Sequence, residues 1–222
     1  MIVSPIVPAV IPQSYEDLQT QIAKLSHLTE VHVDVVDGVF VPPLSWPYTT
    51  ENAIPAVAHA LLAPFSLEVD LMVEDQLGAA AAWLQAGADQ LVFHAEVISP
   101  ALLETFRVTQ DVSVGISSLN SLPLSRLYEY FPFVDYVQVM GIAQIGAQGL
   151  PFDESVLARI AQIQSDFPKM PISIDGSMNA GTLPRIVPLG LSRIIVGSAI
   201  MGQPDPLAAY HELVALVRSQ QA

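Results

Sequence analysis

The chain has 222 residues, 51% of them hydrophobic and 14% charged, and its formal net charge at pH 7 is −14. This apolar content is too high for a disordered chain, and the length suits a single α/β barrel domain with a sizeable core. A protein that binds nucleic acid or an anionic membrane surface needs a basic cluster, and the chain has none. No apolar run reaches the roughly 18 residues that a membrane span requires.

Scarce residue types exclude further kinds of chemistry. The chain has no cysteine, so disulfides, thiolate metal sites and cysteine nucleophiles are ruled out. Its lysines, Lys24 and Lys169, fall outside the strand-like runs, which argues against a Schiff-base mechanism. The segment Met1–Pro5 carries no basic residue, so we see no signal peptide and expect a cytoplasmic protein.

Short apolar runs alternate with amphipathic stretches from one end of the chain to the other. In chain order the predicted strands are Ile2–Ile11, Val31–Asp37, Phe65–Val73, Gln90–Glu96, Ser113–Ser118, Tyr136–Ile142, Pro171–Gly176 and Arg193–Ile200. The predicted helices that follow them are Tyr15–Leu25, Glu51–Leu62, Asp75–Ala86, Pro100–Gln110, Pro123–Phe131, Asp153–Phe167, Ala180–Leu189 and Pro206–Ser219. Strands that alternate with helices run parallel with right-handed crossovers, and about eight such units close into a barrel.

We therefore predict a single-domain (β/α)8 TIM barrel over residues 1–222. A doubly wound open sheet is the alternative, but it usually has fewer strands and a glycine-rich first turn. Here the segment after the first strand reads Pro12-Gln13-Ser14, without a glycine. In a barrel the chemistry lies at the carboxyl ends of the strands, so polar residues inside apolar strands become the candidates for a site.

The second predicted strand carries polar residues at alternate positions. Strand side chains alternate between the two faces, so Val31, Val33 and Val35 share one face, suited to packing under helices. His32 and Asp34 then point together into the barrel. The same alternation turns inward Glu68, Asp70 and Met72 of the third strand, His94 and Glu96 of the fourth, and Asp175 of the seventh.

Each of these residues alone is most simply a buried polar group satisfied by its neighbours. Together, His32, Asp34, Asp70 and Asp175 bring three carboxylates and an imidazole into one barrel mouth, where the carboxylates repel one another unless a cation or a bound proton compensates. Oxygen ligands with one imidazole suit a divalent ion such as Mn, Mg, Fe or Zn. We therefore predict a metal site at the mouth.

Small residues come near the ends of the last two predicted strands. Gly176 and Ser177 follow one strand, and Gly197 and Ser198 lie near the end of the other. Such residues let backbone N–H groups approach a phosphate at its usual place in barrels, and the two hydroxyls can add donors. A single Gly-Ser pair is most often only a turn, but two pairs on adjacent late strands favour a phosphate site.

Several segments, in order along nearly the whole chain, resemble the motifs of ribulose-phosphate 3-epimerases. They are His32–Pro43 (HVDVVDGVFVPP), Asp70–Val73 (DLMV), Phe93–Glu96 (FHAE), Ile174–Ser177 (IDGS) and Val196–Ile200 (VGSAI). The first is long and specific, whereas the last is shared among many phosphate-binding barrels. The resemblance implies a barrel of the ribulose-phosphate-binding type, an isomerase that interconverts ribulose 5-phosphate and xylulose 5-phosphate at C3 with one divalent metal ion.

The resemblance also implies roles for single residues. His32, Asp34 and Asp175 match metal ligands of the family, with Asp70 at the position of another, and Asp34 and Asp175 match its two acid–base carboxylates. The implied substrate-binding positions are Met72, Met140, Gly146, Gly176, Ser177, Gly197 and Ser198. The implied partner is a small-molecule sugar phosphate rather than nucleic acid or membrane, and we expect a homo-oligomer.

Four departures from the family pattern leave other functions open. The chain has Asp70 where the family has a second histidine ligand, Ala9 for a serine and Val36 for a methionine, and it has a looser loop at Gln144–Gly149. An epimerase of another ketose phosphate, for example a hexulose 6-phosphate, would fit a changed pocket. A non-catalytic phosphosugar-binding relative would fit a loss of efficient metal chemistry.

Overall fold

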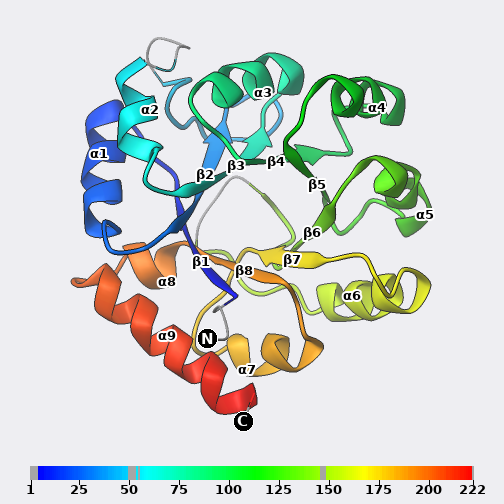
Figure 1. Ribbon diagram of the computed structural model, residues 1–222. Coiled ribbons are helices and arrows are strands. Elements are labelled where there is room, and N and C mark those ends of the chain that lie inside the picture. Colours follow the sequence, from blue (N-terminus) through cyan, green and yellow to red (C-terminus); the bar gives the residue numbers. More distant parts are fainter. Residues whose placement is uncertain (1–4, 50–53, 55, 146–148, 222) are drawn as a thin grey trace.

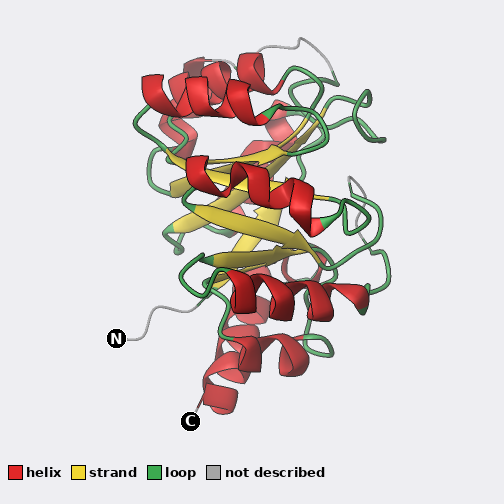
Figure 2. Ribbon diagram, turned by 90° about the vertical axis from the view of Figure 1, so that its right-hand side faces the viewer, coloured by secondary structure: helices red, strands yellow, loops and turns green. Residues whose placement is uncertain are grey.

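The computed structural model describes residues 5–49, 54, 56–145 and 149–221. Eight parallel strands pair in chain order, and β1 also pairs with β8, which closes the barrel. Helices surround this ring of strands on the outside (Figures 1 and 2). The predicted (β/α)8 TIM barrel is confirmed. The assignment of residues 1–222 to one domain stays a prediction.

The strands and helices follow the predicted order. The strands are β1 (Ile6–Val10), β2 (Glu30–Val36), β3 (Ser66–Met72), β4 (Gln90–His94), β5 (Ser113–Ser118), β6 (Tyr136–Met140), β7 (Ile172–Asp175) and β8 (Arg193–Val196). The helices are α1 (Tyr15–Lys24), α2 (Ala56–Leu62), α3 (Gln76–Gln85), α4 (Pro100–Thr109), α5 (Leu124–Leu127), α6 (Ser155–Asp166), α7 (Leu183–Ile186), α8 (Ser198–Met201) and α9 (Pro206–Gln221), with 3-10 turns at Tyr128–Phe133 and Val187–Leu189.

The main core lies between the outer face of the barrel and the helices. Val31, Val33 and Val35 of β2 are fully buried in it, together with Leu18 and Ile22 of α1. The predicted alternation of β2 is therefore confirmed, because the valines pack outward while His32 and Asp34 point inward.

Several predicted elements end earlier than expected, and in three of them the local reason is clear. The strand expected to run to Ile200 stops at Val196, because the carbonyl of Gly197 accepts the N–H groups of Ile200 and Met201 in a helical turn. The strand expected to reach Glu96 stops at His94, whose carbonyl accepts the N–H groups of Val97 and Ile98 in a turn.

The helix expected over Pro123–Phe131 is a short α5 followed by a 3-10 turn. Pro132, which the prediction left outside this helix, lies within that turn, where its ring cannot donate to an α-helical ladder. In the part of the chain that the structure describes, no helix is both long and apolar enough to cross a membrane.

Candidate active site

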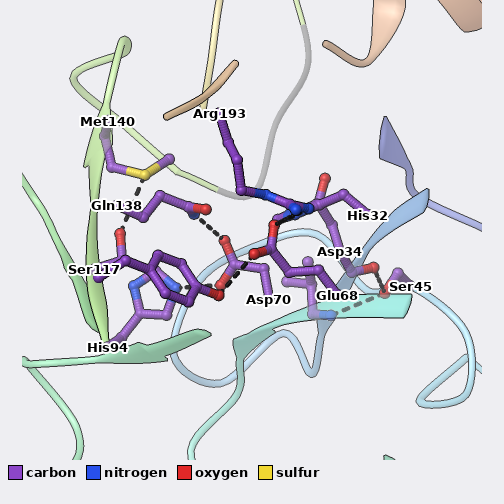
Figure 3. A network of polar contacts seen from close by, with 12 residues as sticks. His32, Asp34, Ser45, Glu68, Asp70, His94, Ser117, Gln138, Met140 and Arg193 are labelled. Atoms are coloured by element: carbon purple, nitrogen blue, oxygen red, sulfur yellow. Dashed lines mark hydrogen bonds and ion pairs between the residues drawn. The ribbon is translucent and has the colours of Figure 1, made fainter. Parts of the chain in front are cut away.

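The inward residues of β2 and β3 lie side by side because these strands pair in register. His32 pairs with Glu68 and Asp34 with Asp70. The imidazole of His32 lies between two carboxylates, with Nε2 2.9 Å from Oδ1 of Asp34 and Nδ1 2.6 Å from Oε1 of Glu68. All four residues are buried, and Figure 3 shows them converging in the barrel interior.

Asp70 is held at both of its carboxylate oxygens. Nε2 of His94 lies 2.7 Å from Oδ1, and Nε2 of Gln138 donates to Oδ2 at 2.7 Å, so β4 and β6 both fix this side chain (Figure 3). Each carboxylate oxygen has two lone pairs, so these contacts leave room for a further ligand bond. Sequence reasoning missed Gln138, although a polar residue at an inward position of an apolar strand is the signal that identified His32.

The predicted metal ligands fall into a group of three and a separate fourth residue. One ligand atom each from His32, Asp34 and Asp70 lies within 4.8 Å of the other two, and all three residues are buried. One nitrogen and two carboxylates at this spacing fit a divalent cation in both chemistry and charge. Asp175 lies outside this group of three and lines the same cavity as Asp34.

Two carboxyl groups of the mouth, those of Asp34 and Asp175, have raised pKa values. Burial raises the pKa of Asp34, and the charges of Asp70 and Glu68 raise it further, against the lowering effect of His32. Burial and the charge of Asp34 raise the pKa of Asp175 well above its ordinary value. A buried carboxyl group with a raised pKa is suited to act as a general acid or base.

The pKa of His32 changes in the direction that its two carboxylate partners impose. Burial alone would lower it, but the charges of Asp34 and Glu68 and the hydrogen bonds to them raise it well above the ordinary value. Without a metal ion, the contacts with Asp34 and Glu68 therefore favour the protonated form of His32.

Below the mouth, toward the amino ends of the strands, lies a second polar group, which we call the amino-end network: Glu68, Tyr136 and Arg193. The Tyr136 hydroxyl donates to Oε2 of Glu68 at 2.7 Å. Nη2 of Arg193 lies 3.5 Å from Oε1 of Glu68, an ionic contact without hydrogen-bond geometry, and Nη1 donates to Glu30 at 3.0 Å. Burial would raise the pKa of Glu68, but His32, Arg193 and Tyr136 together lower it to about 2.

A cavity of about 50 Å³ opens at the carboxyl ends of the strands. Most of the predicted substrate-binding residues line it: Met72, Met140, Gly176, Ser177, Gly197 and Ser198, together with Ala9, Asp34 and Asp175. The methionines come from β3 and β6 and belong to a small apolar cluster with Val36. Gly146 lies outside the described residues, and Glu96, which we expected to point inward, is exposed and accepts the N–H of Leu119.

The backbone after β7 takes an uncommon form beside this cavity. Gly176 has φ 99° and Ser177, which is not a glycine, has φ 57°. The carbonyl of Ser177 accepts hydrogen bonds from the side chains of Asn179 and Thr182, which hold this left-handed conformation. Strain kept in this way beside a cavity is typical of a binding site.

The fold and its mouth define the class of protein: a (β/α)8 barrel with proton-holding carboxylates on separate strands beside a candidate cation site. Comparison with known proteins identifies the family. A model of the ribulose-phosphate 3 epimerase family matches residues 5–201. The chain therefore belongs to the ribulose-phosphate 3-epimerase family, a family of isomerases, and the resemblance noted in the sequence is confirmed.

Two relatives illustrate the similarity. The ribulose-phosphate 3-epimerase of Treponema pallidum is 36% identical over 175 residues, which cover 76% of this chain and 77% of that protein. The ribulose-phosphate 3-epimerase of Bacillus subtilis is 30% identical over 190 residues, which cover 82% and 84% of the two chains.

Solved structures show the same barrel at lower identity. A 3-hexulose-6-phosphate synthase aligns with a TM-score of 0.71 and 20% identity, over 96% of this chain and 99% of that one. KGPDC from Streptococcus mutans aligns with a TM-score of 0.74 and 9% identity, over 98% of each chain. These similarities concern the fold alone.

Proposed function

We propose that the protein interconverts ribulose 5-phosphate and xylulose 5-phosphate by exchanging the proton at C3. One observation carries the proposal: Asp34 of β2 and Asp175 of β7, both with raised pKa values, line the same cavity. Epimerisation next to a ketone needs one group that removes the proton and another that returns a proton on the opposite face. Two carboxyl groups from different strands meet this need.

In this mechanism Asp34 and Asp175 exchange roles with the direction of the reaction. The ionised carboxylate takes the C3 proton, and the protonated carboxyl group supplies a proton to the other face. Each raised pKa favours the shared-proton state, in which one group is ionised and one is protonated. Which of the two addresses ribulose 5-phosphate is decided by the experiment described in the Discussion.

His32, Asp34, Asp70 and Asp175 are the residues that would hold a divalent ion. When bound, the ion would polarise the substrate oxygens at C2 and C3 and stabilise negative charge there. The close group of His32, Asp34 and Asp70 supports this part of the proposal. His94 and Gln138 would keep Asp70 oriented toward that group.

The phosphate of the substrate would lie away from the metal ion, against the backbone of four cavity-lining residues: Gly176, Ser177, Gly197 and Ser198. This placement is supported by the scarcity of cations, because Arg and Lys are absent from the residues that line the described cavity. Met72 and Met140 would contact the sugar. A homo-oligomeric state and a cytoplasmic location stay predictions from the sequence.

The test is a reaction in deuterated water with ribulose 5-phosphate and protein loaded with Mn²⁺. We expect xylulose 5-phosphate to form and deuterium to enter at C3. A hexulose 6-phosphate is assayed in parallel, because faster turnover of the hexulose would overturn the substrate assignment. Absence of C3 exchange with both substrates in metal-loaded protein would instead identify a non-catalytic relative.

A further inference from the structure

Each nitrogen of the His32 imidazole contacts a carboxyl group, and only one of these two groups belongs to a candidate metal ligand. Nε2 faces Asp34, which belongs to the group of candidate metal ligands. Nδ1 faces Glu68, which lies outside that group. A histidine can ligate a cation through one nitrogen only if that nitrogen has lost its proton, and the partner of the other nitrogen decides which one keeps it.

Glu68 is held so that its carboxyl group accepts hydrogen bonds. The hydroxyl of Tyr136 donates to Oε2, and the guanidinium of Arg193 faces Oε1, the oxygen that also contacts Nδ1 of His32. Glu68 and Tyr136 are buried, and the Arg193 side chain is largely so. Because the Tyr136 hydroxyl directs its hydrogen at this carboxyl group and the positive charge of Arg193 favours the ionised form, Glu68 can accept a proton-bearing Nδ1 but has no proton to give.

Tyr136 reaches Glu68 across two intervening strands, and β5 leaves space for it. A Cβ atom at Gly115 would lie 2.5 Å from carbon atoms of the Tyr136 ring, a distance that side chains do not tolerate. The contact between Tyr136 and Glu68 therefore depends on a glycine at position 115.

We propose that Glu68 is a positioning residue that keeps the hydrogen of His32 on Nδ1 and so presents Nε2 to the metal ion, with Tyr136 and Arg193 holding Glu68 in place. This inference rests on the proposed function. It extends the site to groups near the amino ends of β6 and β8, which do not line the described cavity. A carboxylate on the second nitrogen of a metal-binding histidine fixes the ring and strengthens it as a ligand.

A purely structural role would not require this chemistry. Barrel interiors are commonly filled by branched apolar side chains, and a buried ion pair is often no more stabilising than an apolar group of similar size. The direct contact with a candidate metal ligand separates Glu68 from Glu30, the other carboxylate partner of Arg193, which is partly exposed at the start of β2.

The experiment compares Glu68→Gln with Glu30→Gln, each of which removes one carboxylate partner of Arg193. Mn²⁺ affinity is measured by calorimetry on the metal-free proteins. We expect Glu68→Gln to weaken Mn²⁺ binding by about 10–100-fold, the usual effect of losing an outer partner of a ligand, and Glu30→Gln to leave it within about threefold. Equal affinities for all three proteins, or equal losses in both variants, would overturn the inference.

A second measurement does not depend on activity or on metal binding. In the metal-free protein, the strong hydrogen bond from Nδ1–H of His32 to Glu68 should give a downfield proton resonance in NMR spectra. We expect this resonance in the unmodified protein and in Glu30→Gln, and its loss in Glu68→Gln. Its persistence in Glu68→Gln would contradict the assigned contact.

Tyr136→Phe keeps the experiment informative if Glu68→Gln does not fold. It removes the hydroxyl that holds Glu68 without changing the charge, and we expect a smaller loss of Mn²⁺ affinity, about threefold to tenfold. Unchanged affinity in Tyr136→Phe would overturn the role given to Tyr136. If the unmodified protein binds no Mn²⁺, the metal part of the proposed function fails together with this inference.

Discussion

The two ends of the barrel interior treat buried carboxylates in opposite ways. At the mouth, burial and neighbouring acidic groups raise the pKa values of Asp34 and Asp175. In the amino-end network, Glu68 is fully buried, but His32, Arg193 and Tyr136 lower its pKa to about 2. Burial alone therefore does not decide how a carboxyl group behaves. The partners decide, and they divide the interior into a region that holds protons and a region with fixed charge.

The largest effect is expected from removing either proton-holding carboxylate of the mouth. Asp34→Asn and Asp175→Asn should each lower epimerisation by several orders of magnitude, because acid–base catalysis alone contributes about 10²–10⁴-fold and the metal site is also perturbed. Deuterium wash-in at C3 should remain for ribulose 5-phosphate in one variant and for xylulose 5-phosphate in the other.

Metal content is measured alongside, so that loss of the ion is not mistaken for loss of a base. Full epimerisation in both variants with metal retained would show that the acid–base assignment is wrong. Glu30→Gln serves as the comparison from the other end of the barrel, because Glu30 lies at the start of β2, outside the residues that line the described cavity.

The next largest effect is on KM, which should rise when a residue at the mouth is changed and stay nearly constant when a residue at the amino end is changed. Gly197→Val places a branched side chain where the phosphate is proposed to lie, and KM should rise at least about tenfold, the order of one lost hydrogen-bonded contact. Arg193→Gln changes a residue at the opposite end of β8 that contacts Glu68, so with Mn²⁺ at saturation its KM should change much less. Equal KM effects in variants of similar thermal stability would contradict a backbone site for the phosphate.

Metal binding should depend on pH because of groups at the mouth. His32 has a pKa raised well above its ordinary value, and the pKa values of Asp34 and Asp175 are raised too, so protons compete with a cation for these groups. Affinity for Mn²⁺ should therefore rise with pH, by roughly tenfold per pH unit for each proton released. Calorimetry in buffers of different ionisation enthalpy counts those protons. Affinity that does not change between pH 6 and pH 8 would disprove this exchange.

Metal preference should follow the residue at position 70. An aspartate there makes the proposed set one nitrogen and three carboxylates, which favours Mn or Mg relative to Zn. Asp70→His should move the preference back toward Zn, as measured by competition between the ions. An unchanged preference would show that Asp70 is not a ligand, and its contacts with His94 and Gln138 would then be its whole role.

The smallest effect is on the thermal stability of the metal-free protein. Removing a carboxylate should raise Tm at the mouth and lower Tm at the amino end. The folded protein raises the pKa of Asp175, so ionisation costs stability as pH rises above the ordinary value of 3.8. Asp175→Asn removes this cost and should raise Tm at pH 7, by about 2–4 °C for each kcal/mol relieved.

Glu68 has a lowered pKa, so its contribution is present above the ordinary value of 4.5 and is lost as pH falls toward 2. Glu68→Gln should therefore lower Tm at pH 7. Scanning calorimetry at pH 7 and pH 4 measures both variants, and a change of the same sign in the two would remove the contrast between the ends.

The alternation of side chains between the two faces of a strand was enough to predict part of the site from the sequence. His32 and Asp34 lie two positions apart among outward-facing valines, and that spacing alone places them together. The prediction that Glu96 points into the barrel was wrong, because a turn ends β4 at His94 and the alternation of side chains stops with the strand.

Contacts across the barrel could not be predicted in the same way. Tyr136 and Arg193 open their strands, and their contacts with Glu68 depend on how far each strand is staggered relative to the others. Stagger is a property of the closed barrel rather than of any one strand. The resemblance to a family names the residues at the mouth, and it carried no information about these two.

The space beside Gly115 also limits which single substitutions this interior can accept. An alanine at position 115 would place its methyl carbon 2.5 Å from Cε2 and Cζ of Tyr136, so the ring cannot keep its position beside a larger residue. That position is the one from which the Tyr136 hydroxyl reaches Glu68. A larger residue at position 115 therefore needs a compensating change at position 136, and the two neighbouring strands should tolerate the paired change better than the single one.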